Sequence, residues 1–206
     1  MQEDSLKKQV GQSLELNDKD CSIYSFGAFK QEYKNHQAIL NDFENQVEDI
    51  VCFLTSKAEE FDERGIAKTF LYVNERDQEV IGFFTLKIKG LLSESLCLSN
   101  EMLKKLNGGY SSKVEGNILN FYLIGQLGVA KKYQGQKLGK KLLAVAIDII
   151  YETQNNVGGR YILVDAFKSE QILNFYRSFG FRELRSIDNE ETLTMIAPIK
   201  SFFNKT

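Results

Sequence analysis

Apolar residues recur at three- and four-residue intervals between Phe43 and Gly65, which is the spacing of one buried face of an α-helix. Gly65 follows the last apolar position, as is common where helices end. The stripe consists of Val47, Ile50, Val51, Leu54, Ala58 and Phe61. The pattern therefore predicts a single amphipathic helix over residues 43–65.

Runs rich in β-branched and aromatic residues follow this helix. Residues 68–74 and 79–88 are such runs, and the polar stretch ERDQ between them predicts a hairpin. Residues 118–129 form a longer apolar run with Gly125 and Gly128 near its end. A glycine inside a strand often marks a bulge or the close approach of another group.

The second half of the chain alternates between helical and strand patterns. A short helix is expected near residues 100–106, and a longer one runs from the YQGQKLG turn to about Thr153. A strand over 160–167 is followed by a short helix that Ser169 caps. Residues 181–186 and 191–197 predict a closing hairpin. This order predicts a mixed α/β (α+β) domain built around one sheet.

Composition supports a packed globular chain. Of 206 residues, 43% are hydrophobic and 26% are charged, which excludes disorder of the whole chain. Residues 1–20 read as a polar lead-in and 21–200 as one domain. The N-terminus has no apolar core typical of a signal peptide, and no run of about 18 apolar residues exists. We therefore expect a cytoplasmic protein that does not enter a membrane.

The three cysteines, Cys21, Cys52 and Cys97, are far apart and have no CxxC spacing. An odd number of scattered cysteines is typical of unpaired thiols in a reducing compartment. We expect them to be buried or half-buried structural residues.

The stretch YQGQKLGKKLL places glycines and lysines at the predicted start of a helix. The first N–H groups of a helix have no partner within the helix, and the helix dipole adds positive charge there. Glycines let the backbone wrap closely around a ligand. The turn therefore predicts a phosphate or pyrophosphate site. Gly135 and Gly139 are too close together for a Walker loop, and GxGxxG is absent. Taken alone, the pattern also fits an ordinary glycine turn before a solvated lysine face.

The surrounding residues resemble the GCN5-related N-acetyltransferase (GNAT) family. LGVAKKYQGQKLGKKLL is similar to the family's acetyl-CoA loop, [QR]xxGx[GA], which follows a strand ending in L-x-V, and NFYRSFGF is similar to its Y-x-x-x-GF ending. The resemblance covers about residues 66–197, with the cofactor-binding core over about 118–181. It implies a GNAT-like fold: a mostly antiparallel central sheet, a splayed strand pair and flanking helices.

The resemblance also implies which residues hold acetyl-CoA. The backbone groups of Leu127 and Val129 would pair with the pantetheine arm, as the strand before the loop does in this family. The pyrophosphate would lie on the loop, whose residues are Gln134, Gly135, Gln136, Lys137, Leu138, Gly139 and Lys140. Lys137 departs from the family, which normally has glycine there. Its side chain either reaches the pyrophosphate or weakens cofactor affinity.

Transfer to an amine needs a proton for the leaving thiolate and a neutral amine. Tyr176 matches the family tyrosine near the cofactor sulfur and is the candidate acid. Gln126 has no basic group, but it could orient a substrate amine or a water. His36, the single histidine, lies outside the motif region and is expected at the surface. Asp165 could face the site or pair with a lysine. We therefore expect direct attack by an amine that is deprotonated through water.

The acceptor is the least determined property. Within the family, the chain resembles a branch that includes toxins which acetylate aminoacyl-tRNA and pair with a small antitoxin. A tRNA substrate would favour a basic surface, whereas the net charge is −2. We therefore favour a small-molecule or peptide amine, with aminoacyl-tRNA as the alternative. A catalytically weak CoA-binding module is a third reading. Dimers are common for such domains, so a homodimer is considered, although no segment indicates an interface.

Overall fold

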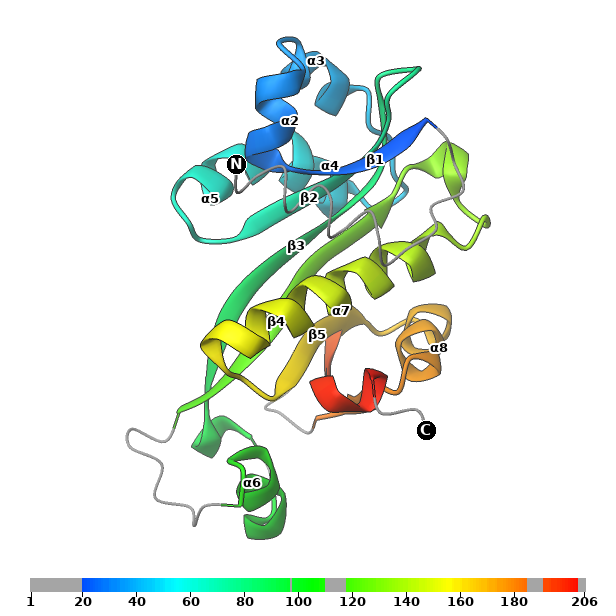
Figure 1. Cartoon of the computed structure of the whole chain (residues 1–206). Helices are drawn as coiled ribbons and strands as arrows, with labels where there is room; N and C mark the ends of the chain where they lie inside the picture. The colour runs from blue at the N-terminus through cyan, green and yellow to red at the C-terminus, as the bar shows by residue number, and fades with distance from the viewer. Residues whose placement is uncertain (1–19, 97, 110–117, 185–190, 204–206) are drawn as a thin grey trace. The chain divides into compact units, whose positions relative to one another are not determined.

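The computed structural model describes residues 20–96, 98–109, 118–184 and 191–203. The predicted lead-in, apart from Asp20, and Cys97 lie outside these ranges. The strands form one seven-stranded sheet in the order β1-β2-β3-β4-β5-β7-β6. Helices flank the strands, so the mixed α/β class predicted from the sequence is confirmed (Figure 1).

The chain divides into two compact units. The first takes its residues from Met1–Lys87 and Gly125–Ile149, and the second from Ile88–Ile124 and Ile150–Thr206. Three elements continue from one set of residues into the other: β3 (Glu79–Leu92), β4 (Ile118–Val129) and α7 (Leu138–Val157). The single domain over 21–200 stays a prediction.

In the first unit, β1 (Cys21–Ser25), β2 (Lys68–Asn74) and the start of β3 are antiparallel neighbours. Four short helices lie near them in Figure 1: α2 (Phe26–Glu32), α3 (His36–Asn41), α4 (Glu48–Ser56) and α5 (Ala58–Glu63). These elements share one apolar core, because each buries its hydrophobic face. Among its fully buried members are Phe26, Phe29, Leu40, Leu54, Leu71 and Phe83.

The predicted helix over 43–65 is wrong in its extent, because the segment forms two helices. Asn45 keeps the chain out of a helix at the start, since its side-chain oxygen accepts the Val47 N–H at 2.9 Å. At Lys57 the backbone leaves helical geometry, with φ −121° and ψ −27°. Ala58 directly after this break is fully buried. Apolar residues of the predicted stripe do face the core, but two helices carry them and not one.

In the second unit, β4 pairs in parallel with β5 (Tyr161–Phe167) through Tyr122, Leu123 and Ile124. β7 (Thr192–Pro198) is antiparallel to β5, and β6 (Arg182–Glu183) is antiparallel to β7. The predicted closing hairpin is therefore present, although residues 185–190 lie outside the described ranges. A separate core includes Leu119, Phe121, Leu163, Leu184 and Ile196.

The remaining elements agree closely with the sequence pattern. β2, β4 and α6 (Asn100–Leu106) have the predicted bounds, and α8 (Glu170–Ser178) begins after Ser169, whose Oγ accepts the Ile172 N–H at 3.3 Å. The sequence pattern did not predict β1, α2 and α3. No described helix is long and apolar enough to cross a membrane. Cys21 is half-buried as expected, but Cys52 is exposed, because it lies on the outer side of α4.

Candidate active site

The glycine and lysine turn joins the end of β4 to the first residue of α7. A 3₁₀ turn, η3 (Lys131–Tyr133), opens it. The Ala130 N–H donates to the Ile81 carbonyl at 2.8 Å, which ties this point to β3. Lys132 Nζ and the Tyr133 hydroxyl both donate to Glu79 Oε2, at 2.9 and 2.8 Å. The start of the turn is therefore fixed by three contacts with one end of β3.

The turn itself depends on two residues in the left-handed region. Gly135 has φ 81° and Lys137 has φ 62°. The Lys137 side chain is exposed, whereas Leu138 is buried and anchors the start of α7. Lys137 therefore takes the conformation that glycine usually supplies at this position. Its exposure shows that the side chain points away from the core.

The direction of the peptide groups in β4 can be read from its bonds to β3. The N–H groups of Ala130 and Gln126 both point toward β3, since one donates to the Ile81 carbonyl and the other to Thr85 Oγ1 at 2.8 Å. Successive residues of a strand direct their polar groups to opposite edges. Leu127 and Val129 therefore present theirs at the other edge, as a pantetheine arm would need.

The carbonyl of Val129 already has two partners within the protein. Asn45 Nδ2 donates to it at 2.8 Å and Gln134 Nε2 at 3.2 Å. Nearby, the Lys131 N–H donates to the Glu44 carbonyl at 2.8 Å. The segment before α4 thus holds the end of β4 in place. Sequence reasoning missed Asn45, and nothing local marks it, because its partner is 84 positions away.

The two glycines of β4 make room for the protein's own side chains. A Cβ on Gly125 would lie 2.9 Å from Thr85 Oγ1, and one on Gly128 would lie 2.6 Å from the Ile50 side chain. On β3, a Cβ at Gly82 would lie 2.7 Å from the Gly128 carbonyl oxygen. The close approach indicated by these glycines is therefore internal packing.

Gln126 lies on β4, directly after Gly125, and is half-buried. Its backbone N–H is bonded to Thr85, and its carboxamide makes no hydrogen bond to another described residue. The side chain is therefore available to a ligand. Its role as an orienting residue stays a prediction.

Tyr176 lies in the second unit, on α8. Its ring packs edge-on against Phe175 and Phe181, with centroids 5.0 and 5.6 Å apart. Burial raises the pKa of Tyr176 to about 12, because the phenolate would lose its hydration. The phenol thus keeps its proton throughout the physiological range, so it can donate a hydrogen bond but cannot act as a phenolate base.

The carboxylate of Asp165 is engaged on both oxygens. Lys89 Nζ lies 2.6 Å from Oδ2, and the Thr194 hydroxyl donates to Oδ1 at 2.8 Å. Of the two readings of Asp165, the lysine pairing is therefore the observed one. This residue links β3, β5 and β7 within the second unit.

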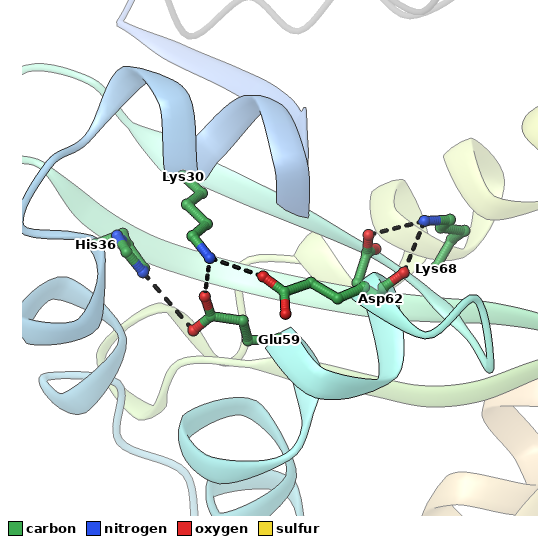
Figure 2. Close-up of polar contacts among 6 residues, drawn as sticks. Lys30, His36, Glu59, Asp62 and Lys68 are labelled. Carbon is green, nitrogen blue, oxygen red and sulfur yellow. Dashed lines mark hydrogen bonds and ion pairs between the residues drawn. The ribbon is translucent and has the colours of Figure 1, made fainter.

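His36 lies among the N-terminal helices rather than fully at the surface. Its Nε2 is 3.8 Å from Glu59 Oε2, and its buried Nδ1 has no partner among the described residues. Figure 2 shows that Lys30 also contacts Glu59, beside the separate Asp62–Lys68 pair at 2.9 Å. The hydrogen bond from Lys30 lowers the pKa of Glu59. These contacts give His36 a structural setting and no place among the predicted site residues.

The first unit brings together all the predicted cofactor residues and Gln126. Their features fit a CoA thioester: a helix N-terminus with exposed Lys137 and Lys140 for the pyrophosphate, and an outward-facing strand edge for the amides of the pantetheine. Within the described residues, no group of three or more His, Cys, Asp or Glu side chains could hold a metal ion.

The family model described as the acetyltransferase (GNAT) domain matches residues 67–183, which is more than half of the chain. The chain belongs to the GNAT acetyltransferase family. The predicted acetyl-CoA-dependent N-acetyltransferase activity is thereby confirmed at the level of the family. The match spans the second and third strands, the turn and α8, so it includes both quoted motifs.

Solved acetyltransferase structures share this fold. AtaT complexed with acetyl-methionyl-tRNAfMet has a TM-score of 0.68 and 23% identity, over 88% of this chain and 96% of that one. A tyrosine-to-phenylalanine mutant of KacT has a TM-score of 0.69 and 19% identity, over 89% and 98%. A similar AtaT mutant, bound to acetyl-CoA and the C-terminus of the antitoxin AtaR, has a TM-score of 0.65 and 20% identity, over 89% and 96%.

Proposed function

We propose that this acetyltransferase moves the acetyl group of acetyl-CoA to the amino group of an aminoacyl-tRNA. One observation carries the proposal: the similarity to AtaT, which was solved with acetyl-methionyl-tRNAfMet, extends over 96% of that chain. It therefore reaches beyond residues 67–183, to which the family-wide match is confined. Because it covers 88% of this chain, the additional part must extend into the residues before position 67, where the helices α2 to α5 precede the shared acetyltransferase core.

Aminoacyl-tRNA thus replaces the small-molecule or peptide amine that the net charge favoured as the acceptor. The net charge of −2 favours a small acceptor, but three acidic side chains of α5 are paired with basic ones. Lys30 pairs with Glu59 and Glu63, and Arg64 pairs with Glu60. Local positive charge can still attract a phosphate backbone, because binding depends on patches rather than on the total.

The turn supplies that local charge. Lys131, Lys137 and Lys140 are exposed there, and none forms an ion pair with another described residue, whereas Lys132 is paired with Glu79. Their charge can serve the cofactor phosphates or a nucleic-acid backbone.

In the proposed reaction Tyr176 holds a proton at its hydroxyl while the thiolate leaves. A phenol with a pKa of about 12 is a much weaker acid than a thiol with a pKa of about 8.5, so complete proton transfer would be uphill. We therefore assign Tyr176 the role of a hydrogen-bond donor to the developing negative charge. The proton that finally neutralises the thiolate comes from the attacking amine, through water.

A small-molecule or peptide amine remains the second candidate acceptor. The net negative charge favours it, because a chain of this charge offers little long-range attraction to RNA. Both candidates share the same donor site and differ only in the acceptor.

Expression in a bacterial host separates the candidates. The intact protein should arrest growth, and acetylated aminoacyl-tRNA should be recovered from the arrested cells, whereas a Tyr176→Phe variant should permit growth. Normal growth together with acetylation of a small amine by the purified protein would favour the second candidate. Acetyl-CoA binding without transfer to any acceptor would leave only the CoA-binding module.

A further inference from the structure

Two threonines are buried opposite each other in the sheet of the first unit. Thr69 on β2 is 0% exposed and Thr85 on β3 is 3% exposed, and the two are direct partners in the β2–β3 register. Apart from Asp62, they are the only buried polar or charged residues in the described part of the chain. A buried hydroxyl is unfavourable unless it forms a hydrogen bond, so each needs a reason.

The two hydroxyls differ in what they contact. Thr69 Oγ1 has no hydrogen-bond partner in the described part of the chain. Thr85 Oγ1 accepts the backbone N–H of Gln126 on the neighbouring strand β4 at 2.8 Å. In a regular ladder a backbone carbonyl of the facing strand accepts such a hydrogen. Here a side-chain oxygen accepts the backbone hydrogen, at the point where β4 approaches the cofactor turn.

Gly125 is matched to this contact. A Cβ on Gly125 would lie 2.9 Å from Thr85 Oγ1, which is closer than real Cβ atoms come to a neighbour. The absence of a side chain at Gly125 therefore leaves the space that the Thr85 hydroxyl fills. Gly125 and the Thr85 hydroxyl together direct the Gln126 N–H toward β3. Because successive residues of a strand alternate, the backbone polar groups of Leu127 then point to the other edge of β4.

We propose that Thr85 is a positioning residue of the acetyl-transfer site. Its hydroxyl fixes the peptide of Gln126, and through it the direction of the Leu127 backbone groups that receive the pantetheine arm. The inference rests on the proposed use of acetyl-CoA. Thr85 touches no reacting atom and acts only through the β4 backbone, so it acts by pre-organising the strand edge.

Thr85→Val keeps the shape of the side chain and removes the acceptor. The contact is partly buried, so loss of its acceptor is unfavourable, and we expect about a tenfold fall in kcat/KM for acetyl-CoA, mainly through KM. Thr85→Ser keeps the hydroxyl and should restore most of the loss. Thr69→Val is the matched control, since it is equally buried on the facing strand and has no bond to lose. It should keep wild-type kinetics.

A second measurement does not depend on activity. Hydrogen exchange of the Gln126 amide, followed by NMR, should be faster in Thr85→Val than in the wild type, and unchanged in Thr69→Val. If Thr85→Val fails to fold, Gly125→Ala provides an independent variant, because its methyl group would crowd the same hydroxyl. It should raise the KM for acetyl-CoA and speed exchange at Gln126.

The outcomes separate this inference from the proposed function. A wild-type protein that binds no acetyl-CoA refutes the cofactor assignment and, with it, the role of Thr85 in the site. If the wild type binds acetyl-CoA, wild-type kinetics in Thr85→Val or an equal loss in Thr69→Val overturns the inference alone. Faster exchange at Gln126 with unchanged KM would reduce Thr85 to a purely structural residue.

Discussion

Replacing Lys137 with glycine tests how the turn holds its anion. Lys137 has φ 62° at a position where the family normally has glycine, and its side chain is exposed. The substitution removes the unfavourable backbone geometry of a residue with a Cβ and removes one positive charge. These two effects act on different quantities, so they can be measured separately.

The stability effect should be small. A residue with a Cβ in the left-handed region costs about 1 kcal/mol, and glycine removes this cost. Glycine also gains about 0.5–1 kcal/mol of conformational freedom in the unfolded chain, which opposes the gain. The free energy of unfolding should therefore change by less than about 1 kcal/mol. Loss of an exposed charge close to the pyrophosphate should weaken acetyl-CoA binding about two- to fivefold, and less at high salt.

The assay is calorimetric titration with acetyl-CoA at low and high salt, together with thermal unfolding. Gln78→Gly is the matched control, because Gln78 has φ 51° in the turn between β2 and β3 and is not among the predicted cofactor residues. It should change stability by a similar amount and leave binding unchanged. Lys137→Asn tolerates the same backbone geometry without the charge and should bind as weakly as Lys137→Gly.

Tighter binding by Lys137→Gly than by the wild type would refute this reasoning. It would mean that the lysine hinders the cofactor, which is the other reading of its departure from the family. Loss of binding in Gln78→Gly would show that the stability of the whole unit, and not the charge, controls affinity.

Three further outcomes follow from the site. Gly139→Asp should keep the fold, since an acidic residue in the first turn of a helix is favourable, but calorimetry should detect no acetyl-CoA binding. Gly139→Ala should keep most of the acetyl-CoA binding. Tyr176→Phe should lower kcat by about two to three orders of magnitude with little change in cofactor affinity, because it removes the hydrogen-bond donor to the developing thiolate, and unchanged turnover would remove Tyr176 from the mechanism. Because the pKa of Tyr176 is raised to about 12, its phenol should stay protonated, and kcat should show no Tyr176-dependent fall below about pH 10. Instead, kcat should rise with pH as the acceptor amine loses its proton. A Tyr176-dependent fall in kcat between about pH 8 and 10 would contradict this reasoning.

Local patterns predicted the elements whose signals are short-ranged. The runs over 68–74 and 118–129 became strands with those bounds, because alternation and β-branched residues act within a few positions. The break at Lys57 was not predictable in this way, since the apolar stripe continues across it. Ala58, directly after the break, is fully buried, and burial depends on the strands that the helices meet.

Neighbouring residues were enough to predict the turn and the family, because Gly135, Gly139 and the lysines are contiguous and their chemistry is local. Which of them face the cofactor stays a prediction. The tertiary structure alone decided that Asn45 reaches Val129, that Asp165 pairs with Lys89, and that Thr85 takes the amide hydrogen of Gln126. Each of these contacts joins residues at least 41 positions apart, and no pattern of neighbouring residues encodes such a pair. They form because packing of the sheet and helices brings polar groups from distant parts of the chain within hydrogen-bond reach.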